Sequence, residues 1–340
     1  MIRFAWMQSR IPLLIAAAGL AIVAVVLGAT GPHLVHLYES TVGSCHSDCS
    51  ATRTAFVKND RALHVGLGAL VVVVPGAIGL FWGAPLVARE FEVGTWRLAF
   101  TQSVTRTRWL GVKLLLGALA SMVVAGLLSL LVTWWSSPID RANATLYASF
   151  EQRDIVPIGY AAFAFALAVL VGVLVRRTVP AMAVSLAAFV GARLGFTHWV
   201  RPHLISPVTG IFSLNATTVT GVAPTAYGNS FLPGPPSLPN AWIYSTKIVD
   251  NTGHPLTSAA LKVLCPQLNL GAGPGGGGRT TAPYPYQDCI PRVAVKFHEV
   301  VVYQPSSHYW PLQWTELAFY IGVAILLVGM SLWATSRRVT

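Results

Sequence analysis

The chain has 340 residues, of which 54% are hydrophobic and only 10% are charged, and its mean hydropathy is +0.59. A soluble domain of ordinary composition carries about 25% charged residues, so the composition excludes an ordinary soluble protein and favours a membrane protein. The net charge of +11 does not indicate a nucleic-acid-binding protein, because no pattern of arginines interleaved with aromatic residues accompanies it.

Apolar runs of about 20 residues predict membrane-spanning helices, since that length matches the hydrocarbon core of a bilayer. Six such runs occur, at Ile11–Ala29, Leu63–Val87, Leu110–Trp135, Val156–Val175, Val179–Thr197 and Thr315–Trp333. Only Arg176, Arg177 and Thr178 separate the fourth run from the fifth, which predicts a tight helical hairpin. Arg193 lies near one end of the fifth run, where we expect its long side chain to snorkel to the interface.

The first run has an alternative interpretation as a signal peptide, because Arg3 and Arg10 give it a basic start. Its length exceeds the 7–15 apolar residues of a signal-peptide core, and no cleavage site of the small-x-small kind follows. We therefore expect a membrane span here, with cleavage as the alternative.

The orientation follows from the excess of Lys and Arg that short cytoplasmic loops carry. With the N-terminus inside, the cytoplasmic segments hold eleven basic residues and two acidic ones, whereas the other segments hold twelve basic and ten acidic residues. This asymmetry predicts that both termini and residues 88–113 are cytoplasmic. Residues 30–62, 136–155 and 198–314 are then external.

The cysteines all fall on the predicted external side, where disulfides persist. They are Cys45, Cys49, Cys265 and Cys289. Four cysteines allow three pairings, of which we favour the two local ones, Cys45–Cys49 and Cys265–Cys289. The alternative for the first pair is a metal site formed by Cys45, His46, Asp48 and Cys49; we expect a pinned loop and no metal.

The external segment 198–314 is long enough for a small domain. Residues 241–249 and 292–303 alternate in the manner of strands. The glycine-rich residues 271–280 between them lack the ending of a phosphate-binding P-loop, so we interpret them as a flexible loop. A zinc-protease motif starting at His298 would need a second histidine where Val302 stands, and we find no catalytic residues.

Residues 88–113 interrupt the apolar sequence with charges of both signs. Gly94 ends the preceding helix, and Thr95 can cap a short new one. On a 3.6-residue period, one face of the new helix carries Trp96, Ala99, Phe100, Ser103 and Val104, and the other carries Thr95, Leu98, Thr101 and Gln102. The second face is small and uncharged and suits a soluble partner. From the residues alone, an ordinary cytoplasmic loop is an equal alternative.

Two segments of the chain resemble bacterial ABC-transporter permeases of the type-2 membrane-domain class. They are PLVAREFEVGTWRLAFTQSVTRTRWLGVKL at residues 85–114, after the second span, and VVYQPSSHYWPLQWTELAFY at residues 301–320, which leads into the last span. The six spans and the long loop before the sixth also fit this family, although residues 205–290 resemble nothing specific.

The resemblance implies an all-α membrane protein with six transmembrane helices and both termini in the cytoplasm. A short amphipathic coupling helix lies between spans two and three, and a large extracytoplasmic loop domain with some β-structure lies between spans five and six. The expected divisions are residues 1–197 for spans one to five, with a coupling segment at 88–109, residues 198–314 for the external domain, and residues 315–340 for span six and the tail.

Permeases of this family are not enzymes; they pair with a separate cytoplasmic ATP-binding subunit and with a second permease subunit, identical or related. The chain has no Walker A sequence, so we expect ATP and Mg²⁺ on the partner subunit and no cofactor on this chain. The resemblance assigns contact with the ATPase to Glu90, Glu92, Thr95, Trp96, Arg97, Leu98, Thr101 and Gln102, with Arg106 and Arg108 at the start of span three.

The implied mechanism is mechanical, and Pro75 and Gly76 in span two are a candidate hinge, because proline removes a helical hydrogen bond. A static kink is the alternative. The path between two permeases would be lined by spans two and five. Apart from Arg193 and His64 we expect almost no ionisable groups in the spans, and an apolar path suits export of a hydrophobic or amphipathic compound. The alternative is a membrane-anchored receptor or assembly protein; an external enzyme lacks supporting residues.

The orientation is testable by labelling of single cysteines at positions 102 and 275, in a variant whose four native cysteines are replaced. A membrane-impermeant thiol reagent applied from outside should label position 275 but not position 102. Labelling of both positions from the same side would contradict the six-span arrangement.

Overall fold

The computed structural model of the chain describes residues 2–46, 49–93, 106–144, 146–225, 228–234, 236, 238–266, 268 and 286–338. It divides into two units. The first comprises Met1–Ile205 and Trp310–Thr340, and the second comprises Ser206–Tyr309. The predicted external segment, 198–314, includes the whole second unit, and residues 198–205 and 310–314 at its two ends belong to the helical unit.

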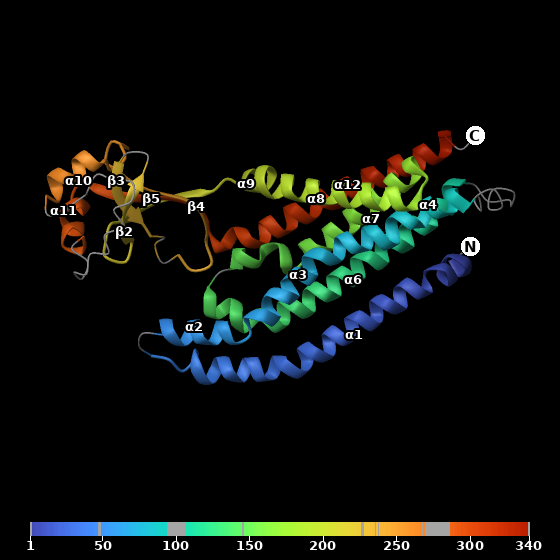
Figure 1. Ribbon diagram of the computed structural model, residues 1–340, viewed down its shortest axis with the longest axis horizontal. Helices are drawn as coiled ribbons and strands as arrows, with labels where there is room; N and C mark the ends of the chain where they lie inside the picture. Colours follow the sequence, from blue (N-terminus) through green and yellow to red (C-terminus); the bar gives the residue numbers. More distant parts are fainter. Residues whose placement is uncertain are drawn as a thin grey trace. The chain divides into compact units, whose positions relative to one another are not determined.

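The first unit is a bundle of long helices (Figure 1). In chain order the described elements are α1 (Ile2–Thr41), α2 (Ser50–Asn59), α3 (Arg61–Ile78), the π-helical turn η1 (Gly79–Gly83), α4 (Ala84–Val93), α6 (Arg106–Asn143), the 3₁₀ helix η2 (Leu146–Gln152), α7 (Val156–Val175), α8 (Thr178–Gly195), the π-helical turn η3 (Phe196–Val200), α9 (Arg201–Leu204) and α12 (Tyr309–Arg338). Helix α1 packs against α6, and both α3 and α6 pack against α7.

Each of the six predicted apolar runs lies within one of these helices or within a continuous helical stretch. Among the described residues, six helical segments are long and apolar enough to cross a membrane. Helix α7 begins and ends at the predicted residues, and a left-handed Arg176 (φ 57°) ends it before α8 begins at Thr178. The predicted hairpin is therefore confirmed.

Helix α7 lies at the centre of the bundle, with sixteen of its 20 residues buried. Its neighbours approach it at glycines. A β-carbon on Gly79 would lie 2.8 Å from the carbonyl oxygen of Ala164, and one on Gly83 would lie 2.8 Å from that of Phe165. A β-carbon on Gly172 of α7 would lie 2.8 Å from the carbonyl oxygen of Ala84. Small residues at these positions let two helix backbones come into direct contact.

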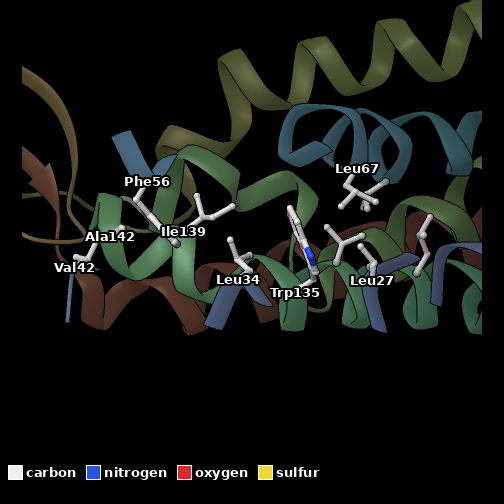
Figure 2. Packing of buried hydrophobic residues seen from close by; sticks show 11 residues of the cluster. Leu27, Leu34, Val42, Phe56, Leu67, Trp135, Ile139 and Ala142 are labelled. Atoms are coloured by element: carbon white, nitrogen blue, oxygen red, sulfur yellow. The ribbon is translucent and has the colours of Figure 1, made fainter. Parts of the chain in front are cut away.

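The outer helix α1 is attached to the bundle by a cluster around Trp135 of α6 (Figure 2). The Trp135 ring is 1% exposed, packs in the same cluster as Leu27 and Leu34, and donates a hydrogen bond from Nε1 to Oγ1 of Thr30 at 2.9 Å. The neighbouring ring of Trp134 packs directly against Gly31. A β-carbon on Gly31 would lie only 2.8 Å from that ring, so the contact requires glycine. The second half of α1 is thereby fixed to α6.

The second unit contains an antiparallel three-stranded sheet of order β1 (Val208–Ser213), β5 (Phe297–Gln304) and β4 (Trp242–Asp250). A separate hairpin pairs β2 (Val219–Thr225) with β3 (Gly228–Pro233). Four short helices complete the described elements: α10 (Ser258–Leu264), η4 (Gln287–Cys289), α11 (Ile290–Ala294) and η5 (Ser306–His308). Side chains of α10, η4 and α11 form one core with those of the strands.

The two predicted strands have different outcomes. The strand at 241–249 is confirmed as β4. The strand at 292–303 is wrong in its first part, because Ile290–Ala294 is helical and β5 begins only at Phe297. Pro291 favours a first helical turn, and this turn buries Ile290 and Val293 in the core. The glycine-rich residues 271–280 lie outside the described residues.

The structure places the cysteines in the two local pairs. Cys265, at the end of α10, joins Cys289 in η4, with Cα atoms 5.8 Å apart, and both residues belong to the core of the second unit. Cys45 joins Cys49 across the turn between α1 and α2, with Cα atoms 6.0 Å apart. Asp48, named in the alternative metal site, lies outside the described residues.

A carboxyl group is buried in the second unit. Glu299, in the central strand β5, is 0% exposed and lies opposite Phe212 of β1 and Ile248 of β4. Within the described parts of the chain, neither of its carboxylate oxygens has a hydrogen-bond partner. Burial raises the pKa of Glu299 to about 7, because a low-dielectric surrounding disfavours the charged form.

This burial predicts a pH-dependent stability of the second unit. The folded pKa of Glu299 lies above its unfolded value, so the stabilisation is complete at low pH and is lost as the pH rises through about 7. We expect the free energy of local opening at β5 to be about 2–3 kcal/mol lower at pH 8.5 than at pH 5. Hydrogen exchange of β5 in the whole protein, corrected for intrinsic rates, measures it.

Glu299→Gln is the control, because an amide does not titrate in this range. Its protection should vary little between the two pH values. Equal pH dependence in the variant and the unmodified protein would contradict the assignment to Glu299.

Candidate functional site

The predicted coupling segment is described at its two edges. Glu90 and Glu92 lie in α4, and Arg106 and Arg108 lie in the first turn of α6, with the Arg108 side chain exposed. The central residues Thr95, Trp96, Arg97, Leu98, Thr101 and Gln102 lie outside the described residues.

Glu90 is bound to the bundle. Its carboxylate accepts a hydrogen bond from Nζ of Lys113 in α6 and forms an ion pair with it. Lys113 is 5% exposed, so the pair is largely withdrawn from solvent. A buried pair of this kind is costly to break, because the remaining charge would lose its partner. The end of α4 is therefore fixed to α6.

Glu92 reaches a different helix. One oxygen of its carboxylate accepts hydrogen bonds from the backbone N–H of Thr178 at 3.0 Å and from its hydroxyl at 2.6 Å. Thr178 is the first residue of α8, where backbone N–H groups lack helical partners and the helix dipole favours a negative charge. The resemblance assigned both acidic residues to the ATPase contact; in this chain they also connect α4 to α6 and α8.

The candidate hinge residues, Pro75 and Gly76, are buried inside α3. A β-carbon on Gly76 would lie 3.3 Å from the ring of Phe189 in α8. The helix continues beyond them and changes to π-helical hydrogen bonding at Gly79–Gly83. The irregularity in span two therefore lies just after Pro75 and Gly76, and their role as a hinge stays a prediction.

A buried network of four charged residues, which the sequence analysis missed, joins four elements of the bundle, η2, α8, α9 and α12. Arg201 donates from Nε and Nη2 to the two carboxylate oxygens of Glu316 in α12, both at 2.8 Å, and from Nη1 to Glu151 of η2 at 2.7 Å. Arg193 of α8 donates to the other oxygen of Glu151 at 2.6 Å. Arg201 is 5% exposed and Glu316 0%.

Neutral groups complete this network. The hydroxyl of Tyr160 in α7 donates to Glu316, and that of Thr197 donates to Glu151 at 2.9 Å. The guanidinium of Arg193 stacks over the Tyr160 ring, 3.5 Å from its centre. Two positive and two negative charges cancel, so the network fixes η2, α7, α8, α9 and α12 together and leaves no net charge.

The network corrects two expectations. Arg193 does not snorkel: it is 7% exposed, because Glu151 and the ring of Tyr160 hold it inside. The spans also contain more charge than expected, since Glu316 lies within the predicted sixth run. A sequence signal was present, because Arg193, Thr197 and Arg201 recur every four residues and so share one helix face.

Among the described residues, the contacts of this network connect helices to one another. No group of three or more His, Cys, Asp or Glu side chains in the described part of the chain has the geometry to hold a metal ion. The six apolar helices define the chain as a multi-pass membrane protein.

Residues 17–201 match the family described as "ABC-2 membrane transporter related", and the chain belongs to this family. The family resemblance seen in the sequence is thereby confirmed. The matched region includes the first resembling segment, 85–114, but ends before the second, 301–320. No curated protein and no solved structure matches the chain. The family indicates the permease of an ABC transporter, which associates with an ABC ATP-binding subunit and is not itself catalytic.

The network predicts a measurable coupling energy between Arg201 and Glu316. Arg201→Met and Glu316→Leu should each lower the free energy of unfolding by about 3–5 kcal/mol, because each leaves a buried charge with fewer partners. The double variant should lose clearly less than the sum of the two. Unfolding in mixed detergent micelles gives the three values.

Arg61→Met, at an exposed position of α3, is the matched control and should change the free energy of unfolding by less than about 0.5 kcal/mol. Strict additivity of the Arg201 and Glu316 variants would show that the pair has no energetic coupling.

Proposed function

We propose that the chain is the membrane-spanning permease of an ABC exporter that moves a hydrophobic or amphipathic compound. A separate cytoplasmic subunit binds ATP and Mg²⁺ and supplies the energy. A second permease subunit, identical or related, completes the pathway. The observation that carries the proposal is the family match across residues 17–201, which includes the segment that we assign to the ATPase contact.

The contacts of α4 support a mechanical route from this segment into the spans. Helix α4 leads directly into it, and the Glu90–Lys113 and Glu92–Thr178 contacts connect α4 to α6 and α8. A displacement of the segment by the ATPase therefore moves three helices together. Interactions that connect rigid helices in this way are the physical basis for coupling between distant sites.

The outward faces of spans two and five support an apolar cargo. Exposed side chains include Val65 and Val73 on α3, and Val184 and Val190 on α8. The charged residues of α8 and α9 are turned inward into the network. A pathway between two copies of these faces would be lined by apolar side chains. Such a lining suits a hydrophobic cargo, because a charged cargo would lose its hydration.

The alternative, a membrane-anchored receptor or assembly protein, assigns the binding function to the second unit. It needs no connection from α4 to α6 and α8, and no movement of the spans. The two functions differ in whether the chain controls ATP hydrolysis.

The coupling role is testable by replacing Thr101 and Gln102 with arginine. The added charges would be buried without partners in the ATPase contact, at a cost of several kcal/mol. The ATPase should then no longer bind, and transport should stop, while the spans remain folded. Pull-down of the ATPase subunit and transport in proteoliposomes measure both effects.

Ser336→Arg, at an exposed position near the end of α12, is the matched control and should bind and transport normally. Normal ATPase binding and transport by the Thr101/Gln102 variant would contradict the coupling role and favour the alternative, in which residues 88–113 are an ordinary cytoplasmic loop.

A further inference from the structure

An apolar cavity of about 540 Å³ lies between α1 and the α3–η1 stretch, with α6 at its base. Its α1 lining runs from Ile11 to Val23, and the cluster around Trp135 begins at its far end, where Leu20 and Val23 pack against that cluster. Every lining side chain is hydrocarbon except for the indole nitrogen of Trp82. Its volume lies within the range of about 300–1,000 Å³ that small-molecule sites occupy.

Water is a poor occupant of this cavity. A buried water needs two to four polar partners, and apolar cavities stay dry. An empty space would forfeit the dispersion contacts of its lining. The three helical segments that form the cavity are all candidate membrane spans, so the medium beside it is the hydrocarbon of the bilayer. The occupant is therefore a hydrocarbon chain.

The charges at one end of the cavity indicate the headgroup. Arg10 directly precedes Ile11, the first lining residue of α1, and its side chain is exposed. Arg89, also exposed, follows the lining residue Trp82 by about two helical turns, on the same side of the helix. Of the acidic neighbours, Glu90 is paired with Lys113, whereas Glu92 keeps its charge and is hydrogen-bonded to the neutral Thr178. The two arginines outweigh this single negative charge, so this end is basic.

From the apolar lining and the basic end we infer that this cavity binds one acyl chain of an anionic phospholipid of the surrounding bilayer, with the headgroup held by Arg10 and Arg89. Basic residues beside a membrane surface attract anionic lipids, and long basic side chains reach the interface from within a span. The bound chain then fills the space between α1 and α3 and supports α1 along its first half. The inference does not depend on the proposed coupling to an ATPase.

The test uses the whole protein in lipid nanodiscs with equal amounts of phosphatidylglycerol and phosphatidylcholine, one of which carries a diazirine on its acyl chain. After illumination, peptide mapping locates the label. We expect the phosphatidylglycerol probe to label residues 11–23 and 70–82, and the phosphatidylcholine probe to label these residues less. Removing the charges with Arg10→Gln and Arg89→Gln should reduce the preference by about fivefold for each arginine.

Gly19→Leu should reduce labelling in these segments, because a β-carbon at Gly19, which lines the cavity, would meet open space and the leucine side chain would occupy part of the volume. Gly191→Leu in α8 is the matched control, since its β-carbon also meets open space but does not line the cavity. It should leave the labelling unchanged.

Three results of the phospholipid experiment would overturn the inference. They are labelling spread evenly along α1, labelling insensitive to Gly19→Leu, and equal labelling by the two phospholipids. A diazirine fatty acid that labels the segments as strongly as phosphatidylglycerol would assign the cavity to single-chain amphiphiles, such as a cargo, and would also overturn it.

Discussion

The arrangement of the bundle depends on one constraint, which is that helices surrounded by lipid gain no hydrophobic energy by associating with each other. They must instead approach closely enough for their backbones and small side chains to make van der Waals contact. Helix α7 satisfies this constraint at Gly79, Gly83 and Gly172, where the neighbouring backbone leaves no room for a β-carbon. The positions of α3, α4, α6 and α8 follow from their contacts with this one helix.

Charged contacts then fix the helices that close packing has brought together. The Arg201–Glu316 pair and its neighbours bind α8 and α9 to α12, and the two acidic residues of α4 bind that helix to α6 and α8. In hydrocarbon such charges are costly unless each finds a partner. These contacts therefore resist separation of the helices and connect them as one group.

Several features could be predicted because they depend on local sequence. The length of each apolar run predicts a span, and the basic pair Arg176–Arg177 predicts the turn between α7 and α8. The spacing of Arg193, Thr197 and Arg201 indicated one polar face, but the pairing in the buried network could not be predicted, because the partners Glu151, Arg201 and Glu316 lie 50 or more residues apart. The helix at Ile290–Ala294 was missed because Pro291 and core packing override an alternating pattern that resembles a strand.

The π-helical turn Gly79–Gly83 determines how α4, which follows it, is rotated about its helix axis. A π-turn accommodates one residue more than an α-turn, and each residue of an α-helix advances the side chains by about 100°. If the turn were converted to α-helical hydrogen bonding with the same sequence, α4 would rotate about its axis by roughly that angle. Glu90 would then face away from Lys113, and Glu92 away from Thr178. A single surplus residue in the middle of span two thus determines which helices α4 can contact.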